Sequence, residues 1–399
     1  MSTSNAYSSD TFSATLFEKM KRINPAVEDM ELYEFRYALH DLIPGDSGWG
    51  SVKLESQAEI VKRINARDFY AGLKLKQRVN DQIVLDENIV RLTRMLFVGL
   101  VKGEYSTEWV NAHFYFDVRG FYFLTRTVYF TDAVLVHFGG KPFKQFAQKQ
   151  KRFERFQGVG YKDFKAANAQ VDQCFIESVQ KLIAAKSTPI LLSLAGPTAA
   201  GKTEIVESLR GAFEQIGKQA TSIEMDNFLL DNDYRDDKGI KSLGKEAYHF
   251  GIFMQSIQKT LQGQKITIPQ YDSSISSHDP DGNLKPGHTS LEVEPADIIF
   301  LEGNFPFQIK EMTDLIGIKI VYLTDDPIRL KRKWKRDMDY RKKYDLNYFR
   351  NRFFRTQFLR AQDCYLPQMQ VCDIVVDTTG AAMWVTPEIA KILERGQVN

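Results

Sequence analysis

From residue 188 onward, short apolar runs alternate with amphipathic stretches. The runs 189–195, 220–225, 297–301, 318–323 and 373–376 each have the length of a buried strand. Between the first two runs, residues 203–216 place apolar side chains at helical spacing. Strands that alternate with helices predict an α/β fold, in which a parallel sheet is flanked by helices.

The earlier part of the chain has a different pattern. Residues 56–64 and 87–97 have apolar positions at helical spacing, a further helix is predicted over 161–185, and residues 113–118 alternate as a strand does. Residues 114–138 are dense in Phe and Tyr. We interpret them as a packed core, with an aromatic surface for a ligand or partner as the alternative. The α/β region is thus preceded by a mainly helical, aromatic-rich domain with some strand.

Polar breaks set the expected boundaries. The serine-rich stretch 1–12 predicts a disordered tail, and the break from Lys186 to Pro189 ends one helix before a strand opens. We therefore expect an N-terminal domain over 13–187, whose role the pattern leaves open, and a second domain over 188–399.

Composition narrows the class of protein. With 399 residues, 43% hydrophobic, the chain has room for two cores, and a net charge of +2 gives no global attraction to nucleic acid or to a membrane. Cys174, Cys364 and Cys372 lack metal-ligand spacing and are interpreted as reduced thiols of a cytoplasmic protein. No apolar run has the length of a membrane span.

A glycine-rich motif follows the first apolar run. It reads G-x-x-x-x-G-K-T and predicts a phosphate-binding loop (P-loop, Walker A), because it lies between a strand and a helix. ATP and Mg²⁺ are the expected cofactors. Lys202 would neutralise phosphate oxygens and the Thr203 hydroxyl would hold the metal. The nucleotide-binding residues are predicted to be Gly196, Pro197, Thr198, Ala199, Ala200, Gly201, Lys202 and Thr203.

Two carboxylates end neighbouring predicted strands. Asp226 follows the run 220–225, and Glu302 follows the run 297–301. Both therefore belong at the edge of the sheet where open α/β sheets bind ligands. We interpret Asp226 as the base that accepts a hydroxyl proton and Glu302 as a second Mg²⁺ ligand, direct or through water.

A basic segment could close over phosphates. Between Arg329 and Arg360 there are thirteen Lys or Arg and three Asp or Glu residues, and Arg332 and Arg336 share one helical face. A lid is favoured; a solvated basic helix and a nucleic-acid surface are the alternatives.

The region 188–379 resembles the uridine kinase and phosphoribulokinase group of P-loop kinases. The matching elements are 196–203, 226–228, 268–272 with His278, 300–303, 329–337 and 365–375. The resemblance implies transfer of the γ-phosphoryl group of ATP to a hydroxyl of a small metabolite. It also implies these site residues: Asp226 and Lys202 with Arg332, Arg336 and Arg341 in catalysis; Phe228, Tyr271, Asp272 and His278 at the acceptor; Thr203 and Glu302 at the metal.

Departures from the group bear on the substrate. Where uridine kinases place an acid-bearing Asp-His-Pro segment, residues 247–251 contain no carboxylate. The spacing from Tyr271 to His278 is longer, Arg341 is followed by two lysines, and Lys333 stands where an arginine is usual. We therefore do not assign uridine as the substrate on the basis of this resemblance.

We expect an ATP-dependent phosphotransferase with an alcohol group as acceptor, on a nucleoside-, sugar- or pantothenate-like metabolite. One alternative is a nucleotide-dependent switch or scaffold with a partner-binding N-terminal domain. Another is a kinase for a macromolecular or nucleotide-linked hydroxyl. The expected partner is a small hydroxyl substrate, with no nucleic acid and no membrane. A homo-oligomer or a protein partner would bind through the N-terminal domain.

Overall fold

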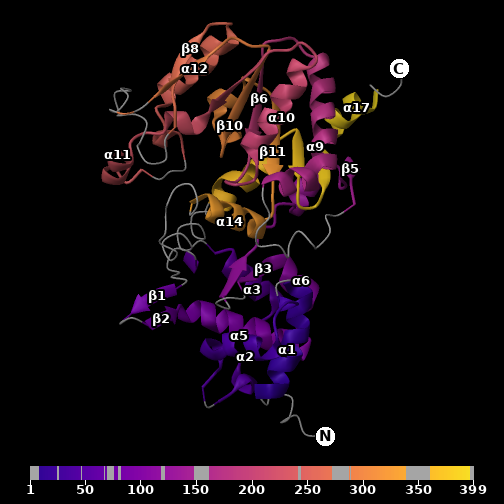
Figure 1. Cartoon of the computed structure of the whole chain (residues 1–399), viewed down its shortest axis with the longest axis vertical. Helices are drawn as coiled ribbons and strands as arrows, with labels where there is room; N and C mark the ends of the chain where they lie inside the picture. Colours follow the sequence, from indigo (N-terminus) through magenta and orange to yellow (C-terminus); the bar gives the residue numbers. More distant parts are fainter. Residues whose placement is uncertain are drawn as a thin grey trace. The chain divides into compact units, whose positions relative to one another are not determined.

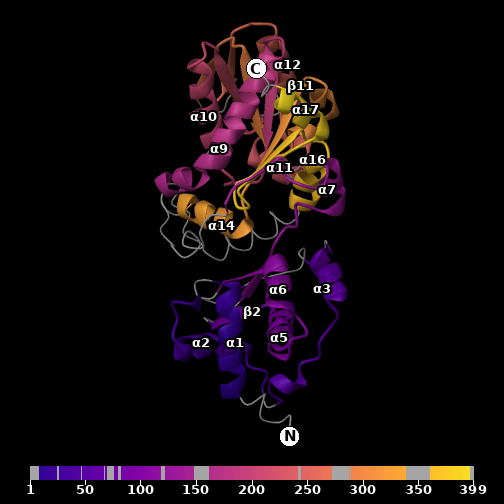
Figure 2. The same ribbon diagram turned by 90° about the vertical axis from the view of Figure 1, so that its right-hand side faces the viewer.

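The computed structural model divides the chain into two compact units (Figures 1 and 2). The first unit comprises Met1–Val128, Gln150–Val159 and Asp326–Leu359, and the second comprises Tyr129–Lys149, Gly160–Asp325 and Arg360–Asn399. The structure describes residues 9–24, 27–45, 47–66, 68–69, 76–79, 82–117, 122–147, 161–240, 244–271, 287, 289–337 and 360–395.

The second unit is built on a seven-stranded sheet in the order β5-β13-β12-β11-β6-β10-β7. The five strands from β7 to β12 run parallel, whereas β13 is antiparallel to β12 and β5 is antiparallel to β13. The strands are β5 (Lys144–Gln145), β6 (Ile190–Ala195), β7 (Ala220–Glu224), β10 (Ile298–Gly303), β11 (Ile316–Leu323), β12 (Ile374–Asp377) and β13 (Ala382–Val385). This confirms the predicted parallel sheet, and each of the five predicted apolar runs forms one of its parallel strands.

Helices cover both faces of this sheet, which explains why its central strands are apolar on both sides. Every residue of β6 and β10 is buried. One face packs on α9 (Tyr161–Ala184), α10 (Lys202–Glu214) and α17 (Pro387–Arg395). The other packs on α7 (Asp132–His137), α12 (Phe250–Leu261) and α16 (Leu366–Met369).

Short elements complete the second unit at the sheet edges. They are the hairpin of β8 (Ile266–Pro269) and β9 (Ser290–Val293), the helices α11 (Asn232–Asp237) and α13 (Lys310–Thr313), the 3₁₀ turns η5 (Met225–Phe228), η6 (Lys245–Ala247) and η7 (Pro306–Gln308), and the π-helical turn η9 (Ala361–Tyr365).

The first unit is mainly helical and has one apolar core, which includes Phe12, Trp49 and Phe97. The predicted helical character is confirmed, and the strand predicted over 113–118 is β3. The elements are α1 (Ser9–Ile23), α2 (Leu32–Ala38), η3 (His40–Leu42), η4 (Trp49–Ser51), α3 (Gln57–Ile64), β1 (Lys76–Val79), β2 (Gln82–Leu85), α5 (Glu87–Lys102), α6 (Thr107–His113), β3 (Phe114–Asp117), β4 (Tyr122–Thr125) and α14 (Asp326–Lys335).

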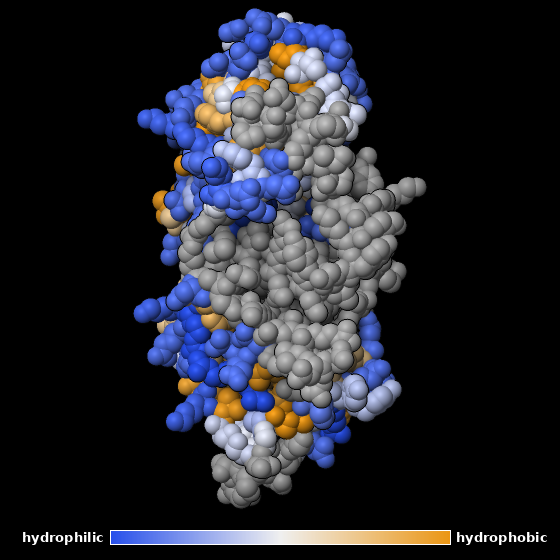
Figure 3. All heavy atoms as spheres, turned by 90° about the vertical axis from the view of Figure 1, so that its left-hand side faces the viewer, coloured by the Kyte–Doolittle hydropathy of each residue, from blue (hydrophilic) through white to orange (hydrophobic). Residues whose placement is uncertain are grey.

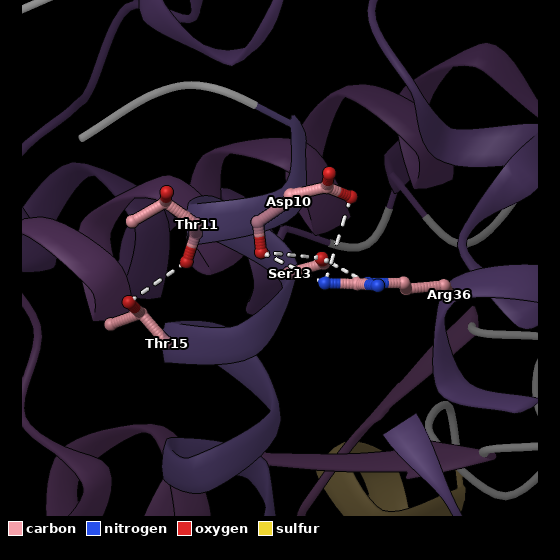
Figure 4. A network of polar contacts seen from close by, with 5 residues as sticks. All are labelled: Asp10, Thr11, Ser13, Thr15 and Arg36. Atoms are coloured by element: carbon pink, nitrogen blue, oxygen red, sulfur yellow. Dashed lines mark hydrogen bonds and ion pairs between the residues drawn. The ribbon is translucent and has the colours of Figure 1, made fainter. Parts of the chain in front are cut away.

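A polar cluster ties α2 to the start of α1 (Figure 4). The Arg36 guanidinium donates from Nε to the Ser13 hydroxyl at 3.0 Å and lies 3.6 Å from the Asp10 carboxylate. Ser13 in turn donates to the Asp10 carbonyl at 3.0 Å. This cluster lies where a disordered tail was expected up to residue 12. That expectation fails for residues 9–12, because Phe12 is fully buried in the core and anchors the helix.

The units do not follow the expected division at residue 187/188. Strand β5 and helices α7 and α9 precede residue 188 but belong to the second unit, and α14 follows it but belongs to the first. Long-range contacts decide this: Met383 pairs with Lys144, and the Thr127 amide donates to the Asp326 carboxylate at 2.9 Å. No local sequence pattern around these four residues predicts either pairing.

The described surface is largely hydrophilic on the face shown in Figure 3, with smaller hydrophobic areas between. Several large apolar side chains are exposed, including Tyr37 and Val136. Among the described residues, no helix combines the length and apolarity needed to cross a membrane.

Candidate active site

The glycine-rich loop joins β6 to α10, as the motif predicts. Its first glycine, Gly196, has a φ of +152°, and a Cβ there would collide with the carbonyl oxygen of Tyr322 on β11. Its last glycine, Gly201, has a φ of +105° and caps α10. Only glycine fits this close approach and these dihedral angles without strain. A helix N-terminus that follows such a loop is a common position for a bound phosphate, because the helix dipole and the first N–H groups favour an anion there.

Side chains hold the loop in place. The Thr324 hydroxyl, directly after β11, donates to the Ala200 carbonyl at 2.8 Å and lies 2.7 Å from the Thr378 hydroxyl. The Lys202 ammonium donates to the carbonyl oxygens of Gly196 at 2.9 Å and Pro197 at 3.3 Å. Lys202 therefore lies across the loop, where a phosphate held by the loop would meet its charge.

The two predicted metal ligands are in contact. Thr203 Oγ1 donates to Glu302 Oε2 at 3.1 Å, which joins the first turn of α10 to the end of β10. Glu302 is 5% exposed. It shares its face of the sheet with Phe300, which packs in the α10 core, so the strand alternation directs the carboxylate to α10.

A second carboxylate, Glu224, lies beside Glu302 and was not predicted. The two residues are register partners on the parallel strands β7 and β10. Burial raises the pKa of Glu302 to about 7, and the Glu224 charge adds to that rise, while Lys202 and the Thr203 hydroxyl oppose it. Burial and the nearby Asp226 likewise raise the pKa of Glu224. The signal in the sequence was an acid within an otherwise uncharged run.

The predicted base, Asp226, lies in η5, directly after β7. Its neighbour Asn227 accepts a hydrogen bond at Oδ1 from the Tyr271 amide at 2.9 Å. That bond joins the predicted acceptor residue Tyr271 to the η5 turn that carries Asp226, although the two segments are far apart in sequence. Close packing fixes the turn, since a Cβ at Gly303 would collide with the Met225 sulfur.

Other predicted site residues have different surroundings. Phe228 is fully buried and packs against Phe253, with ring centroids 4.8 Å apart and the ring planes tilted by 36°, so its side chain belongs to the core. Asp272, His278 and Arg341 lie outside the described residues.

Of the predicted lid arginines, Arg332 lies in α14 and Arg336 directly follows it, both in the first unit. There Lys333 pairs with Asp337 at 2.7 Å, and Arg336 Nε lies 3.9 Å from the same carboxylate.

Within the described part of the chain, few acids lie where they could bind a metal together. Among the described residues, no group of three or more His, Cys, Asp or Glu side chains has the arrangement of a complete metal cage. Glu302, Glu224 and the Thr203 hydroxyl instead offer a few oxygen ligands beside the phosphate loop. Such a set suits Mg²⁺, which binds through a small number of protein oxygens together with water and substrate phosphates.

Comparison with known proteins supports the resemblance for one part of the chain. A uridine kinase of Streptococcus pneumoniae (strain Hungary19A-6) is 27% identical over 225 residues, which cover 53% of this chain and 98% of that protein. A solved D-glycerate 3-kinase from Cryptococcus neoformans is 13% identical, with a TM-score of 0.35, over 47% of this chain and 87% of that one. Residues 191–383 match the model of the Phosphoribulokinase / Uridine kinase family, which confirms the resemblance over this segment.

Proposed function

We propose that the protein is an ATP-dependent kinase that phosphorylates a hydroxyl group of a small metabolite. The observation that carries this proposal is the meeting of three adjacent strand ends, β6, β10 and β7, which present Lys202, Glu302 and Asp226 on one edge of the sheet. Open α/β sheets bind ligands at this edge, where the strand order reverses around β6. The family match supports phosphoryl transfer at this edge.

Each residue then has a defined task. The loop amides and Lys202 bind the phosphates, and Thr203 and Glu302, with Glu224 beside them, hold Mg²⁺. The metal supplies positive charge to the phosphate oxygens. Asp226 accepts the proton of the acceptor hydroxyl. The hydroxyl oxygen forms a bond to the γ-phosphorus while the bond from that phosphorus to the bridging oxygen of ADP breaks.

The decisive experiment is a metabolite-library screen with γ-labelled ATP, run on the full-length protein and on Asp226→Asn. We expect a labelled product from the parent and a loss of about 10²–10⁴-fold in Asp226→Asn, the usual contribution of a general base. Asp236→Asn, on an exposed position of α11, is the matched control and should keep full activity.

Binding of ATP with Mg²⁺, measured by calorimetry, should persist in both variants. A parent protein that binds no nucleoside triphosphate with Mg²⁺ would contradict the proposal. Nucleotide binding without transfer to any member of the library would instead favour the switch or a macromolecular acceptor.

A further inference from the structure

A strand outside the family match reaches the turn of residues 378–381, which joins β12 to β13. This strand is β5, which precedes the segment that matches the family model but belongs to the second unit. There Gln145 is the register partner of Ala382 at the start of β13. Phe143 directly before β5 and Phe146 directly after it pack on the core of α9 and α10. The short strand is therefore fixed at the end of the seven-stranded sheet.

Gln145 also holds the turn through its side chain. Nε2 of Gln145 donates to the Gly380 carbonyl at 2.6 Å, and the Phe146 amide donates to the Ala381 carbonyl at 2.9 Å. Ala381 has a φ of +50°, in the left-handed region that residues with a side chain rarely adopt. The Gly380 amide in turn donates to the Asp377 carboxylate at 2.9 Å. Hydrogen bonds from β5 and from the end of β12 thus keep a strained turn in place.

The same turn is bound to the end of β11. Thr379 Oγ1 accepts the Asp325 amide at 2.8 Å, and the Thr378 amide donates to the Leu323 carbonyl at 3.0 Å. In the sheet β11 lies between β12 and β6, and all three strands are parallel. Since β6 leads into the phosphate loop, the turn and the phosphate loop follow the two strands that flank β11, at one edge of the sheet.

Two buried threonine hydroxyls complete the connection to the phosphate loop. Thr324 and Thr378 are 1% and 0% exposed, and their hydroxyl oxygens lie 2.7 Å apart. Each hydroxyl has one hydrogen to donate. Because Thr324 donates its hydrogen to the Ala200 carbonyl at 2.8 Å, the hydrogen between the two oxygens comes from Thr378. The Leu323 carbonyl, 2.9 Å from Thr378 Oγ1, already accepts the Thr378 amide. The donors therefore run from the turn through both threonines to the phosphate loop.

Resting on the proposed kinase function, we propose that Gln145 is a positioning residue for the nucleotide phosphates. Gln145 fixes the turn of residues 378–381, and the turn fixes the Thr378 hydroxyl. Through Thr324, that hydroxyl holds the Ala200 carbonyl, so that the phosphate loop is ordered before the nucleotide binds. A loop that is already ordered loses less entropy on binding, which raises its affinity for the ligand. The affinity for the nucleotide thus depends on a strand that the family model does not include.

Calorimetry on the full-length protein with Mg²⁺ tests this with two ligands, ATP and inorganic tripolyphosphate. Gln145→Ala should weaken the binding of both by the same factor, about 3- to 10-fold, the usual worth of one neutral hydrogen bond. Gln145→Glu keeps the size of the side chain but loses the donor, so it should weaken both at least as much. Gln145→Lys supplies a donor again and should restore most of the affinity. Gln258→Ala, at an exposed position of α12, is the matched control.

A double-mutant cycle distinguishes the connected hydrogen bonds from separate local effects. Thr378→Val removes the hydroxyl and keeps the shape of the side chain, whereas Thr378→Ser keeps the donor and should bind both ligands as the wild type does. If Gln145 and Thr378 act through one another, Gln145→Ala combined with Thr378→Val should weaken binding by less than the product of the two separate factors. Denaturant unfolding without nucleotide should give Gln145→Ala and Gln258→Ala similar stability, because both side chains are exposed.

Wild-type affinity of Gln145→Ala for both ligands would overturn the inference, and so would independent effects of the two substitutions in the cycle. Weaker binding of ATP with unchanged binding of tripolyphosphate would also overturn it, because the turn would then act on the nucleoside and not on the phosphate loop. A Gln145→Ala protein that loses stability together with affinity would give this residue a structural role only. A wild-type protein that binds neither ligand would instead contradict the proposed kinase function.

Discussion

The two units use polar residues for different purposes. In the first unit they begin helices and join them: Ser56 and Glu59 form a capping box at α3, and Arg36 links α2 to α1. In the second unit, Asp226 directly follows the edge strand β7 and Glu302 lies near the end of the buried strand β10, both beside a glycine-rich loop. Polar residues at strand ends on one edge of a sheet indicate chemistry, whereas polar residues at helix starts indicate only architecture.

This contrast predicts that substitutions at the second unit's strand ends reduce activity and leave the fold intact. Lys202→Ala should lower phosphoryl transfer by about 10²–10³-fold, the usual cost of removing one group that stabilises the developing charge. Lys202 also bonds loop carbonyls and offsets the charges of Glu224 and Glu302, so we expect a smaller loss of about 1 kcal/mol of unfolding free energy beside the loss of rate.

Steady-state rates and denaturant unfolding of the same samples check the prediction. Lys238→Ala, at an exposed position after α11, is the control. A Lys202→Ala protein that unfolds at much lower denaturant concentration would show that the loop lysine has a structural role.

Glu224 and Glu302 give a second test of the comparison. Their arrangement suits a metal ion, but two neighbouring carboxylates lower the stability of the folded protein. Because the pKa of Glu302 rises from 4.5 unfolded to about 7 folded, the native state binds more protons between these values. Stability is therefore greatest below about pH 4.5 for this group and falls as the pH rises toward 7. Glu302→Gln should raise the unfolding free energy by roughly 1–3 kcal/mol at pH 8 without Mg²⁺, and by much less at pH 5.

The groups that face Glu302 are Glu224 on β7 and Lys202, Thr203 and Glu204 on α10. Denaturant unfolding at the two pH values measures the difference, with Glu214→Gln, exposed at the end of α10, as the control. Equal stability of wild type and Glu302→Gln at pH 8 would show that the buried carboxylates do not repel one another.

The smallest effect is expected in the first unit. Arg36→Ala removes the bonds to Ser13 and Asp10, which are partly exposed, and should cost about 1 kcal/mol of unfolding free energy. Nucleotide affinity should be unchanged. Thermal unfolding and calorimetry test this, with Arg22→Ala near the end of α1 as the comparison; a loss of nucleotide affinity would mean that this unit acts on the phosphate loop.

The sequence predicted those features of the site that depend on local patterns. The loop, Asp226 and Glu302 follow apolar runs, and their spacing alone places them at one sheet edge. Glu224 was missed because it lies inside a strand, where only the register with Glu302 shows its role.

The division into units was hardest to predict, because it depends on partners far apart in sequence. Asp326 begins a basic helix that the pattern placed with the phosphate loop, but its carboxylate accepts the Thr127 amide 199 residues earlier. The α14 helix therefore belongs to the unit in which the sequence indicated no chemistry.

Strand β5 has a consequence for the order in which the protein folds. It is only two residues long, it is synthesised before the other six strands of its sheet, and it pairs with β13, which is synthesised last. The ribosome must therefore release nearly the whole chain before that edge of the sheet can close. Contacts over such a separation form slowly, because a long loop must be ordered first. Until then β13, when formed, presents an open edge to other chains, the kind of surface from which aggregation begins.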